Sequence, residues 1–176
     1  MRNLLCTFFI IASVLVFGGA CAQGDAQKNT ATQSAPKAAA TPAKNFTAAD
    51  IAKLKWIEGT WRGMDGDKPF YERYKIEETA MVVEGLKEDG SPDGDPSRFE
   101  LKNGMFGKDE GDKGSAASEI TADYVQFVPA VSGKRNNFRF ERQSDGTWIA
   151  LLEWPATNDK PARTKMYKME RWQPKK

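Results

Sequence analysis

Short segments in which apolar and polar residues alternate follow one another along most of this chain. In one of them Phe70, Glu72, Tyr74 and Ile76 share a face, and the residues between them are mostly charged. Alternation with a period of two is typical of strands that bury one face. The pattern therefore predicts a fold built almost entirely from strands. The predicted strands span residues 60–64, 70–76, 79–86, 98–102, 105–106, 119–128, 138–140, 147–154 and 162–172.

Turn-forming residues separate these segments at short intervals. Asp65-Gly66-Asp67, Asn103-Gly104 and Ser144-Asp145-Gly146 each lie between two of them, and such sequences favour tight hairpins. The segment 108–117 is predicted to be a polar loop, as is the acidic segment 88–96. We expect neighbouring hairpins in an antiparallel up-and-down β-barrel of about eight to ten strands, because closure removes the exposed edges.

A short helix is expected immediately before the first strand. Thr47 fits an N-cap, Asp50 stands where its carboxylate reaches back to it, and Phe46 and Ile51 have the spacing of a hydrophobic staple. Gly59 is expected to end this helix. A helix this short needs a surface to pack on, so we expect it to lie as a lid on one end of the barrel.

The amino terminus predicts export. Residues 1–22 combine a positive charge, an apolar run and small residues, as in a secretory signal peptide. Two processing routes stay open. Gly19-Ala20-Cys21 resembles the lipobox of bacterial lipoproteins, except for Gly18, and would make Cys21 the lipidated first residue; ordinary cleavage before Gln23 is the alternative.

Residues 23–45 are rich in Ala, Thr, Pro and Lys. This composition predicts a disordered linker ahead of one domain at 46–176. Such a linker also favours the lipoprotein route, because it would connect the lipid to the domain. We expect a bacterial envelope protein facing the periplasm, anchored to the outer membrane through lipid on Cys21, or otherwise periplasmic or secreted.

The composition excludes several kinds of chemistry. The chain has no histidine and only two cysteines, Cys6 and Cys21, both ahead of the predicted domain. A Ser-His-Asp triad, a histidine-ligated haem and a conventional zinc site are therefore excluded. The net charge of +2 gives no strong field for nucleic acid. No cofactor or metal is predicted, and the acidic segment 88–96 lacks EF-hand spacing.

Four features together resemble the lipocalin-like (calycin) superfamily: a capped helix ahead of the strands, Gly59-Thr60-Trp61 on the first strand, a series of neighbouring hairpins, and a last strand rich in basic and aromatic residues. Within the superfamily the chain is most similar to an uncharacterised family of secreted bacterial domains. The motifs shared with that family are the Trp-x-x-Gly-x-Trp element at 56–61, the acidic-aromatic Tyr-Glu-Arg-Tyr at 71–74, and the Pro-x-x-x-x-x-Tyr segment at 161–167. The resemblance spans nearly the whole predicted domain and implies a barrel with a cavity, but no particular ligand.

The resemblance also implies structural roles for three residues. Trp61, which follows Gly59 by two positions, is expected to plug the closed end of the barrel. An arginine from the last strand is expected to pack across its ring, and Arg171 and Arg163 are the two candidates.

Apolar strands and two carboxylates supply the candidate binding residues. Glu72 and Glu84 lie among apolar neighbours, so either could point inward and hold a polar head group or act as an acid or base; ion pairs or outward charges are the alternative. Aromatic rings on inward faces could line a pocket or fill the barrel completely. The predicted ligand-binding residues are Phe70, Glu72, Tyr74, Glu84, Tyr124, Phe138, Phe140, Trp148 and Leu152.

Two functions follow from these features. The favoured one is an envelope-tethered protein that binds a small hydrophobic or amphipathic ligand inside its barrel. The alternative is an interaction module with a filled barrel, whose loops at 88–96 and 108–117 contact an envelope protein. An enzymatic activity is the least favoured hypothesis, because the sequence contains no catalytic motif. The sequence does not indicate an oligomeric state.

Overall fold

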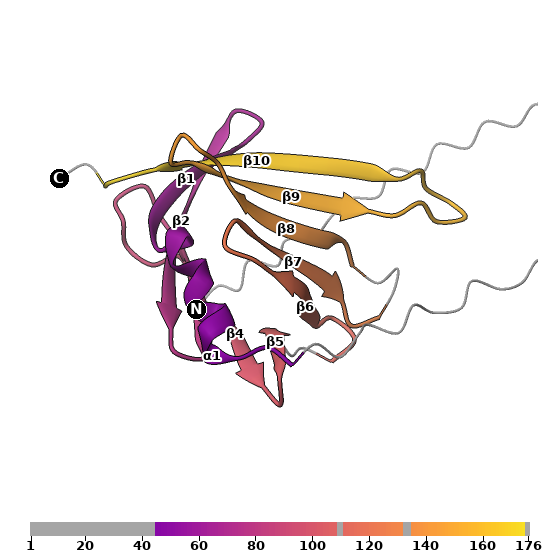
Figure 1. Ribbon diagram of the computed structural model, residues 1–176. Coiled ribbons are helices and arrows are strands. Elements are labelled where there is room, and N and C mark those ends of the chain that lie inside the picture. The colour runs from indigo at the N-terminus through magenta and orange to yellow at the C-terminus, as the bar shows by residue number, and fades with distance from the viewer. Residues whose placement is uncertain (1–44, 109–110, 132–134, 175–176) are drawn as a thin grey trace, which may run out of the picture. The chain divides into compact units, whose positions relative to one another are not determined.

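The computed structural model describes residues 45–108, 111–131 and 135–174 (Figure 1). The predicted signal peptide at 1–22, the lipidation of Cys21 and all but the last residue of the predicted linker lie outside the described residues. The described residues belong to a single compact unit.

Within the described residues, a helical segment leads into ten strands. The helix α1 covers Ala48–Ala52 and continues into a turn of 3-10 helix, η1, at Lys53–Ile57. The strands are β1 Gly59–Asp65, β2 Lys68–Glu77, β3 Ala80–Leu86, β4 Ser97–Lys102, β5 Met105–Lys108, β6 Ser115–Ile120, β7 Tyr124–Pro129, β8 Asn137–Arg142, β9 Trp148–Trp154 and β10 Arg163–Arg171.

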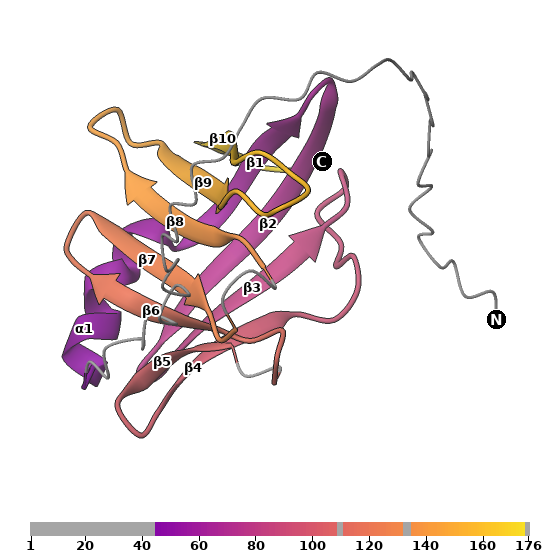
Figure 2. The same ribbon diagram turned by 90° about the vertical axis from the view of Figure 1, so that its right-hand side faces the viewer.

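The strands form one closed antiparallel barrel in which each strand pairs with its neighbours in sequence. Closure comes from β1 and β10, where Trp61 lies opposite Arg171 and Arg62 opposite Glu170. Figure 2 shows α1 at the end of the barrel where the β4–β5 and β6–β7 hairpins turn. The predicted fold class, an all-β up-and-down barrel with a short helix before it, is confirmed.

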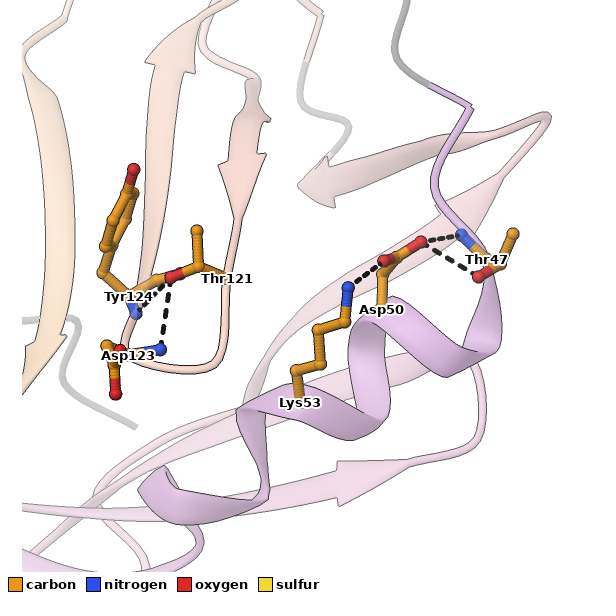
Figure 3. A network of polar contacts seen from close by, with 6 residues as sticks. All are labelled: Thr47, Asp50, Lys53, Thr121, Asp123 and Tyr124. Atoms are coloured by element: carbon orange, nitrogen blue, oxygen red, sulfur yellow. Dashed lines mark hydrogen bonds and ion pairs between the residues drawn. The ribbon is translucent and has the colours of Figure 1, made fainter.

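One predicted strand is wrong. Residues 119–128 were expected to form a single strand, but they divide between β6 and β7 around a turn at residues 121–123. The Thr121 hydroxyl accepts hydrogen bonds from the backbone N–H groups of Asp123, at 3.2 Å, and Tyr124, at 3.0 Å (Figure 3). Such a threonine turn contains neither Gly nor Pro, so the apolar alternation on either side of it concealed the break. β6 also begins at Ser115, inside the segment that was predicted to be a loop.

The helix begins as the sequence predicts. The Asp50 carboxylate accepts hydrogen bonds from the backbone N–H and the hydroxyl of Thr47, each at 2.9 Å, and pairs with Lys53 at 2.7 Å (Figure 3). Gly59 then takes a φ of +118°, a conformation that glycine adopts readily, and turns the chain into β1. The position of the lid helix is therefore set by a capped start and a glycine at its exit.

Replacing Asp50 with alanine should lower the free energy of unfolding by about 1 kcal/mol, because the first turn loses the acceptor that satisfies its backbone. Urea denaturation measures this effect. Lys55→Ala, an exposed change on the same segment, is the control and should change stability by less than about 0.5 kcal/mol. Equal stabilities for the two variants would show that the cap contributes nothing.

Candidate functional site

The end of the barrel beneath the helix is closed by Trp61. Its indole N–H donates to the Ile57 carbonyl at 2.7 Å, and its side chain is fully buried. The guanidinium of Arg171 lies 3.9 Å from the centre of the Trp61 ring and also donates to the Glu58 carbonyl. Of the two candidate arginines, Arg171 thus packs across Trp61, which ties the last strand to the helix–strand junction.

Arg163 has a different position. Its guanidinium stacks 4.1 Å from the centre of the Trp154 ring, at the other end of β9 and β10. Only one of the two arginines therefore supports the closed end.

A cluster of aromatic rings fills the interior above Trp61. The centre of the Trp148 ring lies 5.9 Å from the ring centre of Trp61, 5.3 Å from that of Tyr74 and 5.1 Å from that of Phe140, in edge-to-face contacts. Phe127 stacks on Phe138 at 4.6 Å and is fully buried. Edge-to-face and offset contacts of this kind add to the stabilisation that burial supplies. The fully buried rings of Trp61, Trp148 and Phe127 therefore form a plug in the half of the barrel next to the helix, and the partly buried Phe138 lies at its border.

The opposite half of the barrel is less completely buried. Its inward side chains pack on the core but stay partly exposed, unlike the fully buried rings of Trp61, Trp148 and Phe127. Phe70 meets Tyr167 edge-on at 5.2 Å between ring centres. The partly buried apolar residues that face inward here are Phe70, Val83, Phe138, Leu152 and Tyr167. We call this region the open half.

A carboxyl group stands where the plug meets the open half. Glu72 lies on the inner face of β2 between Phe70 and Tyr74, and the Tyr74 hydroxyl donates to it at 2.7 Å. Burial raises the pKa of Glu72, because a charged carboxylate loses its hydration there. Burial and the neighbouring carboxyl raise the pKa of Tyr74 well above its usual value, so this hydroxyl stays protonated as the donor.

Space lies beside this carboxyl group. The residue opposite Glu72 on β3 is Gly85, which has no side chain. A Cβ atom placed on Gly85 would meet only the Asp93 carbonyl oxygen, at an ordinary contact distance of 3.5 Å. At Gly63, by contrast, Phe70 and Met169 already occupy the space. Next to Glu72, β3 therefore has a gap with room for at least a Cβ atom.

Cationic side chains near the open half are already engaged. Lys165 forms an ion pair with Asp65 at 2.7 Å, and its ammonium lies 5.0 Å from the centre of the Tyr167 ring. Lys108 donates to the Ser97 hydroxyl at 3.2 Å. Among the described residues, the only hydrogen bond to Glu72 comes from Tyr74, and no cation pairs with it.

The raised pKa of Glu72 predicts a pH-dependent stability. Folded protein retains the Glu72 proton above 4.5, its ordinary pKa, where unfolded protein has lost it. The free energy of unfolding therefore falls as the pH rises from 4.5 through the folded pKa. Glutamine cannot ionise, so Glu72→Gln should not show this fall. The free energy of unfolding of the variant should exceed that of the parent at pH 7, and the difference should disappear at pH 4. Denaturant titrations at both pH values test this, and parallel pH profiles would contradict it.

Seven of the nine predicted ligand-binding residues lie on inner faces, and two do not. Glu84 lies on the outer face of β3 and pairs with Arg73 across the sheet. Tyr124 lies on the outer face of β7, where the Arg139 guanidinium stacks on its ring at 3.8 Å. The prediction that these two side chains line the interior is wrong. The residues that do face inward are Phe70, Glu72, Tyr74, Phe138, Phe140, Trp148 and Leu152.

Sequence reasoning missed three residues of the open half: Val83, Gly85 and Tyr167. Val83 and Gly85 face Tyr74 and Glu72 across the β2–β3 pair, so the alternation of β2 continued onto β3 would have found them. Tyr167 alternates with Met169 along β10 and lies opposite Ala150. Their inward orientation follows from strand register, although Tyr167 is also the last residue of the motif at 161–167.

The outer surface carries a separate hollow over β4 and β5. It has a volume of about 500 Å³. Its charged residues form ion pairs with one another, such as Arg98 with Glu100 at 2.9 Å. The lining includes the exposed side chain of Met105 and the glycines Gly107 and Gly114.

The described residues contain no group of three or more metal-binding side chains. No helix among the described residues is long and apolar enough to cross a membrane. A scan against protein-family models found no match, and a search of curated proteins found no significant one.

Proposed function

We propose that the open half of the barrel binds a small hydrophobic or amphipathic molecule. The observation that carries this proposal is the contrast between the two halves of the interior. Trp61, Trp148 and Phe127 are fully buried. Phe138, Leu152 and Tyr167 keep exposed surface although they face inward. An apolar surface that stays accessible inside a barrel gains free energy when a ligand covers it.

The polar groups of the open half support an amphipathic ligand. Small-molecule sites are mostly apolar and contain a few polar groups that fix the orientation of the ligand. Glu72 has this character, because its inward carboxyl group is held by Tyr74 on one side and faces the gap at Gly85 on the other. The ligand's apolar part would lie against Leu152 and Phe138, and its polar part would point to Glu72.

Uptake of the uncharged fluorescent probe N-phenyl-1-naphthylamine tests the proposal. We expect saturable binding with a fluorescence increase, because the probe moves into an apolar site. Gly85→Leu should abolish this binding by placing a side chain in the gap. The φ angle of Gly85 is not positive, and a Cβ atom there would meet only the Asp93 carbonyl oxygen, at 3.5 Å. Glu84→Gln, on the outer face of the same strand, should bind the probe like the parent. No saturable binding by a folded parent protein would refute the proposal.

We further propose that the barrel is exported and tethered to the bacterial envelope through lipid on Cys21. The lipobox-like sequence and the composition of residues 23–45 support this. Mass spectrometry of the mature protein from its host should show a lipid-modified amino-terminal cysteine. An unmodified chain that begins at Gln23 would establish ordinary cleavage instead.

A second candidate function is an interaction module, and the outer hollow over β4 and β5 favours it. Met105 is 56% exposed there, and an exposed methionine suits contact with a protein. In this case Met105→Glu should abolish crosslinking to one envelope protein and leave probe uptake unchanged. A crosslinking pattern that this substitution does not alter would exclude the hollow as the contact surface.

A further inference from the structure

Among the described residues of the open half and its border, Glu72 is a carboxyl group without a cationic partner. This property bears on the charge of the ligand, given the proposed function on which this inference rests. A partly buried carboxylate without a cationic partner is costly, because it has lost hydration and gained little in return. Glu72 has this problem: among the described residues, its only hydrogen bond comes from the neutral Tyr74 hydroxyl. A ligand that brings a positive charge would remove the cost.

No side chain in the described part of the chain supplies that charge. Lys165 pairs with Asp65 at 2.7 Å, at the ends of β10 and β1 far from the lid helix. Arg171 is held at the closed end by the Trp61 ring and the Glu58 carbonyl. These two cations of β10 therefore have other partners, as does Arg163, which stacks on the Trp154 ring.

Aromatic side chains lie on both sides of Glu72 along the inner face of β2. Phe70 and Tyr74 flank Glu72 on the same face of β2, and Tyr167 meets Phe70 edge-on at 5.2 Å. Aromatic faces attract cations, and the attraction is larger where water is excluded. An acidic group among aromatic rings suits an ammonium group better than a neutral or an anionic one.

The position of the gap sets the direction of the ligand. Space beside Glu72 lies over Gly85, and the partly buried side chains of Val83, Leu152 and Phe138 continue the apolar surface from it. A linear molecule could therefore place its polar end at Glu72 and its chain along this surface. We infer that the ligand of this barrel is an amphipathic amine, whose ammonium group pairs with Glu72 and whose hydrocarbon chain occupies the open half.

Three ligands with the same chain and different head groups test this inference on the full chain. Octylamine, octanol and octanoate are titrated at pH 7 by displacement of N-phenyl-1-naphthylamine. We expect octylamine to bind roughly tenfold tighter than octanol, as a charge-assisted hydrogen bond allows. Octanoate should bind weakest, because its charge repels Glu72.

Two matched variants separate a specific pairing from a general charge effect. Glu72→Gln should lower the affinity for octylamine roughly tenfold and leave the affinity for octanol unchanged, because only the ion pair is lost. Glu84→Gln removes the same charge from the outer face and should change none of the three affinities. Circular dichroism checks that both variants are folded. The order of the three affinities in the parent protein is a test that does not depend on the variants.

The outcomes distinguish this inference from the proposed function. If octanol binds as tightly as octylamine, or if Glu72→Gln leaves octylamine unchanged, the open half binds apolar chains but the amine selectivity is wrong. If neither the probe nor any of the three ligands binds, the proposed function itself fails.

Discussion

Replacing Trp61 with alanine should lower the free energy of unfolding by about 3–5 kcal/mol, the usual cost of deleting a large buried aromatic side chain. The ring is fully buried and contacts Trp148 at 5.9 Å between ring centres. The substitution also removes the hydrogen bond to the Ile57 carbonyl and leaves the Arg171 guanidinium without its aromatic partner. The helical segment, the first strand and the last strand all lose the contacts that they make through Trp61.

Urea denaturation of the domain measures this cost, with Trp61→Phe as the control. Phenylalanine keeps a ring for Arg171 and Trp148 but lacks the indole N–H, so the control should lose less stability than the alanine variant. If Trp61→Ala unfolds at the same urea concentration as the parent, Trp61 does not close the barrel.

Phe127→Ala should have a similar effect, about 3–5 kcal/mol. Phe127 lies at the centre of the plug and is fully buried. Its ring contacts those of Phe138 at 4.6 Å, Phe99 at 5.0 Å and Phe106 at 5.9 Å. Alanine would leave a cavity among rigid rings that cannot collapse to fill it.

Phe127→Leu serves as the control in thermal denaturation. Leucine restores much of the volume, so the loss of stability should fall to about half or less of that of the alanine variant. A small effect of Phe127→Ala would mean that the plug is loosely packed, which would contradict the division of the interior into a filled and an open half.

The sequence predicted the barrel because its strands bury only one face. Alternation along β2 and β4 and glycine-containing turns such as Asn103-Gly104 identified most hairpins. The helix was predictable for a similar local reason, since Thr47, Asp50 and Gly59 act within a few residues of one another. The β6–β7 hairpin was missed, because Thr121 makes its turn through side-chain hydrogen bonds that many sequences could make.

The candidate site was predictable only in part, because it depends on the register between strands. A strand exposes opposite faces at successive residues, so an error of one position reverses a side chain. Glu84 has apolar neighbours on both sides and gave no sign that it faces outward toward Arg73. Tyr124 is the first residue of its strand, where the alternation has no preceding residue to fix its phase.

The division of the interior into two halves could not be read from the sequence. Both halves contain aromatic residues, and Phe138 and Phe140 differ by only two positions. Their burial depends on rings contributed by several distant strands, as the contacts of Trp148 with Trp61, Tyr74 and Phe140 show. The unpaired state of Glu72 likewise depends on where Lys165 and Arg171 find their own partners.

Native mass spectrometry of the protein purified gently from its own host tests the central claim most directly. We expect one small amphipathic molecule bound at close to one copy per chain, and we expect Gly85→Leu to lose it while Glu84→Gln retains it. A parent protein with the mass of the chain alone, which also takes up no apolar probe, would contradict the claim that the open half is a binding site.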